Sequence, residues 1–317
     1  MERLRHFVVP ALAVFLLAFA WMLASAYARQ QQAHAQCPTW PECYHALSAV
    51  IAPDSPAADD IEWTQAAADG TLLIALAGLA GFGWKRREAT LDWRWGIPAI
   101  ALVLVAIGWT LRLAYAGPGV LLWQWLAALG VCALLWWLVL RELRFLRPLA
   151  EAAAMRALRP RALTALLLAL FAALLGGWAG AHAIGLPCPD FPACRGAWWP
   201  EINLIAVVTA VTAQPDEATA VALTVGHRLA ALTVLIYVMW LGVHLWRTGT
   251  QDHLCRYGLL VLGTLLLAVG IGIMTAVTRL PPVTAVAHSA ASALLILSLV
   301  TLYYVVQPVT RPGKDSA

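Results

Sequence analysis

Two histidines in the second half of the chain are the residues best suited to chemistry in a largely apolar sequence. His227 stands near the start of one long apolar segment, and His288 stands near the start of another. One apolar segment lies between these two, so both enter from the same side, and we expect the imidazoles at a similar depth. A histidine inside a membrane-spanning segment is costly without a partner and usually marks a functional site.

The chain contains an internal repeat. The segment CPDFPAC at residues 188–194 has an earlier copy, CPTWPEC, at residues 37–43. A repeat of this kind indicates two related structural units. We therefore predict two halves, residues 1–150 and residues 151–317.

Alignment of these halves relates the two histidines to two glutamines. Gln65 falls on His227, and Gln124 falls on His288. The second half therefore has an imidazole at both positions, and the first half has an amide at both.

The composition is that of an integral membrane protein. Of the 317 residues, 62% are hydrophobic and 12% are charged, and the mean hydropathy is +0.74. A spanning helix requires about 20 mostly apolar residues. We predict an all-α membrane fold with eight transmembrane helices, arranged as two tandem, pseudo-symmetric four-helix bundles. The predicted spans are residues 7–29, 63–84, 96–115, 120–140, 162–182, 222–246, 257–278 and 283–306.

Two apolar segments of the chain have alternatives to an ordinary spanning helix. The first could be a cleaved signal peptide, but its apolar run is long and no clear small-residue cleavage site follows it, so we predict a spanning helix. Residues 202–213 are apolar but too short to span, and we predict an interfacial or re-entrant helix there.

The basic residues gather in alternate connections, which places those connections and both termini in the cytoplasm. The loops with the cysteine pairs then face outward from a bacterial inner membrane. The net charge of +4 follows from this bias and requires no nucleic-acid partner.

Four of the six cysteines lie in the loops that we predict to face outward. On an oxidising outer side, Cys37 with Cys43 and Cys188 with Cys194 are predicted disulfides. Cys132 is expected to be apolar filler on a helix, and Cys255 an ordinary thiol at the edge of a loop.

The paired histidines favour a heme site. Two histidines on different helices of a four-helix unit can ligate a heme iron from both faces. Arg228 and Arg279 lie at the same outward level and are candidates to pair with heme propionates, although Arg279 is equally well explained as a boundary residue. For each histidine alone, the alternative is a hydrogen bond to a backbone carbonyl of another helix.

The first half lacks these ligands, because glutamine does not bind heme iron with ordinary strength. Glu62 lies one helical turn before Gln65 on the same face. It also lies near the Cys37–Cys43 loop, although an acid at the membrane edge is often only solvated. Glu62, Cys37 and Cys43 are therefore the candidate catalytic residues of this half.

These features resemble the heme A synthase family of membrane enzymes over nearly the whole chain. The resemblance rests on the four-helix halves, the outward cysteine loops, the sequence Gly226-His227-Arg228, and the spacing from Pro282 to His288. It implies that the histidine pair binds heme b, and that the first half surrounds heme O, whose methyl group is oxidised to a formyl group.

By position, Glu62 matches a glutamate of that family, while Gln65 and Gln124 stand where the family has histidines. One hypothesis is a heme A synthase-like oxidoreductase with heme O as substrate, and with heme O synthase or terminal oxidase assembly factors as partners in the lipid bilayer. Another is a non-catalytic heme b protein in electron transfer or oxidase assembly. A transporter with parallel repeats would need ionisable residues at mid-helix, and we expect almost none.

Overall fold

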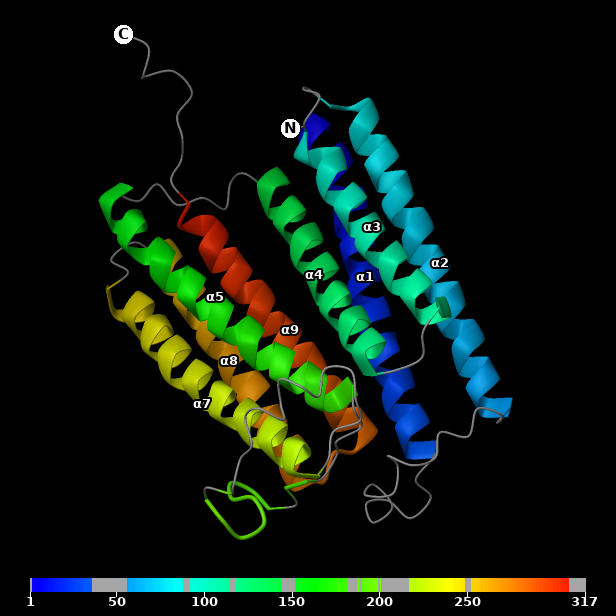
Figure 1. The fold of residues 1–317 in the computed structure, drawn as a ribbon. Helices are drawn as coiled ribbons and strands as arrows, with labels where there is room; N and C mark the ends of the chain where they lie inside the picture. The colour runs from blue at the N-terminus through cyan, green and yellow to red at the C-terminus, as the bar shows by residue number, and fades with distance from the viewer. Residues whose placement is uncertain are drawn as a thin grey trace.

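The computed structural model describes residues 2–35, 56–87, 92–114, 118–143, 152–181, 187–188, 190–198, 200, 217–248 and 252–307. Its elements in this part of the chain are α-helices (Figure 1). They are α1 (Glu2–Ala35), α2 (Pro56–Lys85), α3 (Trp93–Ala114), α4 (Pro118–Glu142), α5 (Ala152–Ala181), α7 (Glu217–Thr248), α8 (Asp252–Val277) and α9 (Pro282–Val305). The predicted helix at residues 202–213 lies outside the described residues.

All eight of these helices contain a stretch long and apolar enough to cross a membrane. These stretches are Phe7–Tyr27, Trp63–Lys85, Trp93–Ala114, Leu122–Glu142, Ala157–Gly180, Ala218–Arg247, Leu254–Val277 and Pro282–Val305. The predicted all-α fold with eight membrane-spanning helices is therefore confirmed.

Several helices begin before the predicted span. The largest consequence concerns His227, which we expected at the start of its helix. Because α7 begins at Glu217, His227 lies about 15 Å along the helix axis from that end at 1.5 Å per residue. The difference arises because small residues such as Ala218 and Ala220 extend the helix before the strongly apolar run begins.

The helices fall into two groups that lie side by side (Figure 1). Helices α1–α4 contact one another in a ring, and helices α5, α7, α8 and α9 form a second ring. The rings meet where α1 and α4 pack on α9 and where α4 packs on α5. This arrangement is consistent with the predicted tandem bundles. The start of α1 and the end of α9 lie at the same end of the molecule.

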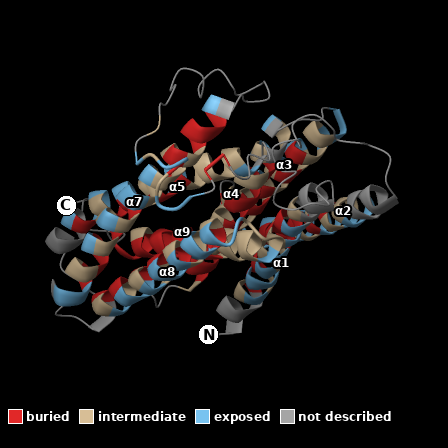
Figure 2. Ribbon diagram, turned by 90° about the horizontal axis from the view of Figure 1, so that it is seen from below, coloured by how far each residue is buried: buried red, intermediate tan, exposed pale blue. Residues whose placement is uncertain are grey.

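The seam between the two groups is filled by aromatic side chains. Trp136 of α4 donates its Nε1–H to Thr301 Oγ1 of α9 at 2.8 Å. Its ring also packs 5.1 Å from the ring of Phe15, and Trp137 packs edge-on against Tyr304 at 5.2 Å. Figure 2 shows that buried residues line the facing sides of the helices, so one apolar core runs through both groups.

Helices α7 and α8 approach closely at a pair of glycines. A Cβ atom on Gly258 would lie 2.9 Å from the backbone oxygen of Gly242, and one on Gly242 would lie 2.6 Å from Leu262 Cγ. Both distances are shorter than van der Waals contact. The absence of side chains at these two positions therefore sets how closely α7 and α8 pack.

We predict that Gly258→Ala lowers the thermal unfolding temperature of the protein in detergent, because overpacking of this kind costs about 1–3 kcal/mol. The matched control is Gly263→Ala in the same helix, where a Cβ atom would meet nothing within 4 Å. Alanine is preferred over glycine in a helix by about 1 kcal/mol, so the control should be neutral or stabilising. Equal unfolding temperatures for the two variants would contradict the close approach.

Candidate functional site

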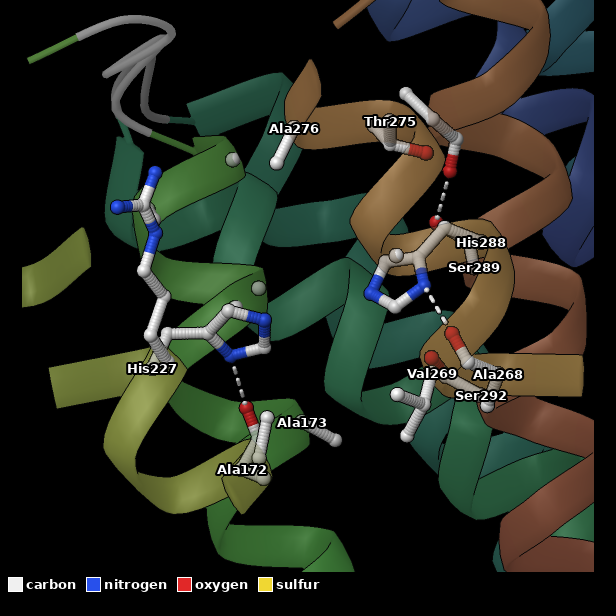
Figure 3. A pocket seen from close by; sticks show the side chains of 18 of the residues that line it. Ala172, Ala173, His227, Ala268, Val269, Thr275, Ala276, His288, Ser289 and Ser292 are labelled. Carbon is white, nitrogen blue, oxygen red and sulfur yellow. Dashed lines mark hydrogen bonds between the residues drawn. The ribbon is translucent and has the colours of Figure 1, made fainter. Parts of the chain in front are cut away.

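The second group of helices encloses a cavity of about 490 Å³. Helices α5, α7, α8 and α9 supply most of its walls, and Ala26 of α1 and Trp125 of α4 close one side. Most of the lining side chains are apolar or small, and both His227 and His288 face the interior (Figure 3). A volume of this size lies within the range of about 300–1,000 Å³ that is usual for small-molecule and cofactor sites.

The two imidazoles face each other across this cavity. Their ring centroids are 6.3 Å apart, and the ring planes are inclined by 76°. His227 Nδ1 lies 2.9 Å from the backbone oxygen of Ala172, and His288 Nδ1 lies 3.1 Å from that of Ala268. A carbonyl oxygen only accepts hydrogen bonds, so each Nδ1 carries the proton. In the neutral rings, each Nε2 therefore keeps its lone pair.

Both rings rest on a glycine one helical turn after the accepting carbonyl. A Cβ atom on Gly176 would lie 2.8 Å from His227 Cε1, and one on Gly272 would lie 2.7 Å from His288 Cε1. The same arrangement therefore occurs twice, with a carbonyl and a glycine on one helix and a histidine on its neighbour. It fixes both the position and the rotation of each ring.

The geometry fits a heme held by two histidines. A metal–imidazole bond is about 2.0–2.1 Å, and the ring centroid lies about 1.1 Å behind the nitrogen, so two rings on opposite sides of one iron have centroids about 6.3 Å apart. The measured separation of 6.3 Å agrees with this value. No cluster of three or more His, Cys, Asp or Glu residues occurs in the described part of the chain.

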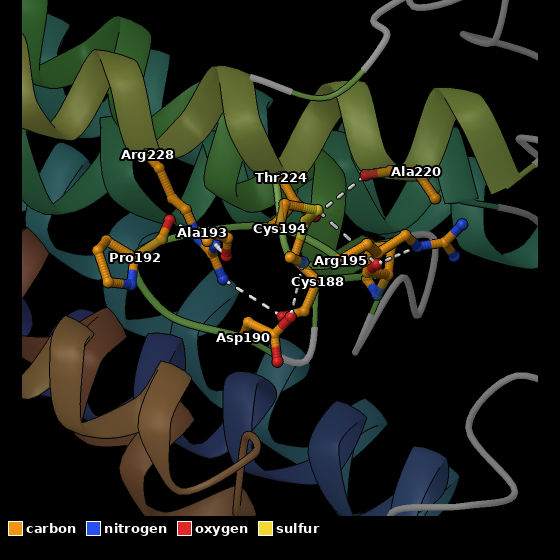
Figure 4. Close-up of a disulfide and its surroundings, with 11 residues drawn as sticks. Cys188, Asp190, Pro192, Ala193, Cys194, Arg195, Ala220, Thr224 and Arg228 are labelled. Atoms are coloured by element: carbon orange, nitrogen blue, oxygen red, sulfur yellow. Dashed lines mark hydrogen bonds between the residues drawn. A yellow bond between two sulfur atoms is a disulfide. The ribbon is translucent and has the colours of Figure 1, made fainter. Parts of the chain in front are cut away.

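Arg228 contacts the loop that follows α5. Its guanidinium donates to the backbone oxygens of Ala193 at 2.9 Å, Pro192 at 3.3 Å and Cys188 at 3.3 Å (Figure 4). The side chain also lines the cavity. Arg228 thus fixes this loop beside the cavity, a role that the sequence did not indicate. Its pairing with propionates stays a prediction.

Arg279 lies in the turn between α8 and α9. Its backbone has φ of +63°, in the left-handed region, and its side chain is exposed. It is not among the described residues that line the cavity. The structure therefore does not bring Arg279 to the site in the way that it brings Arg228.

The disulfide between Cys188 and Cys194 is present, as predicted (Figure 4). The two cysteines pack against Val221 and Val225 at the start of α7. Cys188 also lines the cavity together with Phe191, so the disulfide anchors the loop at its edge. Cys132 and Cys255 are free thiols.

The candidate catalytic residues of the first half are less completely described. Cys37 and Cys43, with their predicted disulfide, lie outside the described residues. Glu62 belongs to α2, but its side chain also falls outside what the structure describes. Gln65 of the same helix donates to Ser25 Oγ of α1 at 3.0 Å, and Gln124 is buried in α4.

The first half contains a charged network that sequence reasoning missed. Asp69 of α2 is 2% exposed, and its Oδ1 accepts a hydrogen bond from Trp21 Nε1 at 2.6 Å. Its Oδ2 lies 3.0 Å from Arg112 Nη2 of α3. Asp69 is an exception to the expectation of almost no ionisable residues at mid-helix. The sequence does contain an indication of this network, because an aspartate inside a membrane-spanning segment usually marks a functional site.

Taken together, the fold and the site define an all-α membrane protein with a cavity suited to a heme between two histidines. Residues 60–300 match the family described as cytochrome oxidase assembly protein, COX15-CtaA, and the chain belongs to that family. It is 28% identical over 313 residues to the heme A synthase of Shewanella oneidensis, an alignment that covers 89% of this chain and 91% of that protein.

We predict that both cysteine pairs are oxidised in the purified protein. Denatured protein alkylated without reductant and mapped by mass spectrometry should carry label at Cys132 and Cys255, which serve as the internal control. Cys188, Cys194, Cys37 and Cys43 should be protected. Label at Cys188 and Cys194 would contradict the disulfide in the structure, and label at Cys37 and Cys43 alone would reject the first-half pair.

Proposed function

We propose that this chain is a heme A synthase-like membrane oxidoreductase that holds a heme b between His227 and His288. It would take part in converting heme O to heme A for a terminal oxidase. The observation that carries the proposal is the pair of imidazoles, with ring centroids 6.3 Å apart and both Nδ1 atoms bonded to carbonyls. The match to a heme A synthase over most of the chain supports the reaction.

In this proposal the protein positions and insulates the cofactor. The carbonyls of Ala172 and Ala268 hold each ring in one tautomer and make Nε2 a stronger ligand. When bound, heme b supplies reversible one-electron chemistry. The apolar walls exclude water, and Arg228 places a positive charge at the cavity edge, where a propionate would be stabilised.

The outward end of α2 is the proposed location of the substrate chemistry. Glu62 lies one helical turn before Gln65, and Cys37 and Cys43 precede this helix in the sequence. We assign these three residues to the neighbourhood of heme O. The proposed setting is a bacterial inner membrane, with the termini in the cytoplasm and the cysteine loops on the outer side.

A second candidate is a non-catalytic heme b protein that serves electron transfer or oxidase assembly. The observation in its favour is the first half, where Gln65 is bonded to Ser25 and the interior is occupied by Asp69 and its partners. Loss of a substrate site in that half would leave the heme b half intact.

We predict that His227→Ala and His288→Ala each abolish the low-spin heme spectrum, because one imidazole cannot ligate both faces of the iron. The matched control is His244→Ala in α7, whose ring lies 3.4 Å from Arg161 and does not line the cavity. The reduced optical spectrum of each purified variant measures the effect. Unchanged Soret and alpha bands in both site variants would reject the ligand assignment.

The two candidate functions predict different hemes in purified protein. Extraction and chromatography should yield heme A or a hydroxylated heme O beside heme b if the chain oxidises heme O. Expression together with a heme O synthase supplies the substrate. Heme b alone under these conditions would reject the oxidoreductase and favour the second candidate.

A further inference from the structure

We infer that the first half is a closed copy of the heme cavity, in which Trp21, Asp69 and Arg112 occupy the place of a porphyrin. The chain would then hold one heme, in its second half. The inference about the number of hemes rests on the proposed histidine site, whereas the closure of the first half rests on the contacts described below.

Two contacts show that the halves superimpose in register. The offset that carries Cys37 onto Cys188 also carries Ser25 onto Gly176. Gln65 contacts Ser25 just as His227 contacts Gly176.

The second contact involves the other ligand position. The offset that carries Gln124 onto His288 also carries Gly108 onto Gly272. A Cβ atom on Gly108 would lie 3.8 Å from Gln124 Cγ, and one on Gly272 would lie 2.7 Å from His288 Cε1. Matched residues therefore meet at both ligand positions.

The same offsets identify what fills the first cavity. Trp21 corresponds to Ala172, Asp69 to Ala231, and Arg112 to Ala276. All three alanines line the second-half cavity. The alanines leave open space in the second half, and the larger side chains of Trp21, Asp69 and Arg112 occupy the corresponding space in the first half.

These side chains are fixed in place by one another. Asp69 bonds Trp21 at 2.6 Å and pairs with Arg112 at 3.0 Å. The cavity that remains beside Trp21, Asp69 and Gln124 has a volume of about 10 Å³, which is at most the space of one water molecule. A planar macrocycle cannot enter unless this network is dismantled.

The two glutamines are therefore not the sole difference between the halves. In the sequence, the first half differs from the second by glutamines in place of the two histidines. In the structure, Trp21, Asp69 and Arg112 also occupy the space between its helices. A heme O molecule undergoing oxidation would have to bind outside this closed interior.

The test is the ratio of heme to protein, measured by pyridine hemochrome and amino-acid analysis. Wild type should contain about one heme per chain, and the heme should be lost in His227→Ala with His288→Ala. The double variant Gln65→His with Gln124→His should also contain about one heme per chain. Adding Trp21→Ala, Asp69→Ala and Arg112→Ala to that double variant should raise the ratio towards two.

A reciprocal variant tests whether the three side chains suffice to exclude heme. Ala172→Trp, Ala231→Asp and Ala276→Arg together should remove the second-half heme, while the Cys188–Cys194 disulfide persists as the check on folding. The control is Leu167→Trp, at an exposed position of α5 outside the cavity, which should keep its heme.

The outcomes separate this inference from the proposed function. In protein produced without a heme O synthase, two hemes per wild-type chain, or two in Gln65→His with Gln124→His, would overturn the closed first half. A heme that survives the loss of both second-half histidines would place it in the first half and would also overturn the inference. A wild type without heme would reject the histidine site and agree with a closed first half.

Discussion

The site depends on the hydrogen bond between each imidazole Nδ1–H and a backbone carbonyl of the neighbouring helix. Inside a membrane, a polar ring nitrogen without a partner is costly. The carbonyls of Ala172 and Ala268 provide that partner, and they leave Nε2 of each ring directed to the cavity. A hydrogen bond to a carbonyl seemed an alternative to metal binding when each histidine was considered alone. In the proposed heme site, this bond prepares the ring to bind the iron.

The two halves share the same arrangement of four helices but differ in the side chains between those helices. The second half combines histidines with glycine and alanine, and a large cavity results. The first half places Trp21, Asp69 and Arg112 at the positions of three of those alanines, and the cavity beside Trp21 and Asp69 has a volume of only about 10 Å³. The buried carboxylate of Asp69 has a hydrogen-bond donor in Trp21 and a cation in Arg112 beside it, and these partners offset the cost of its charge in the bilayer.

Much of the fold was predictable because bilayer thickness dictates the length of an apolar helix. The spans, the second disulfide and the placement of His227 and His288 in one four-helix group follow from such local patterns. Side-chain partners were harder to predict, because they depend on the rotation of each helix about its axis. Four contacts depend on this rotation and could not be predicted from the sequence. They are the hydrogen bonds to the carbonyl acceptors, the contact of each ring with glycine, the binding of Arg228 to the disulfide loop and the pairing of Asp69 with Arg112.

The most direct test of the account is electron paramagnetic resonance of the oxidised, purified protein. Two imidazoles on one iron give a low-spin ferric signal, and ring planes inclined by 76° favour a strongly anisotropic one. We expect that signal in the wild type at about one spin per chain, and its loss in His288→Ala. A high-spin ferric heme in the wild type, or a low-spin signal that persists without His288, would contradict the claim that His227 and His288 together hold the heme.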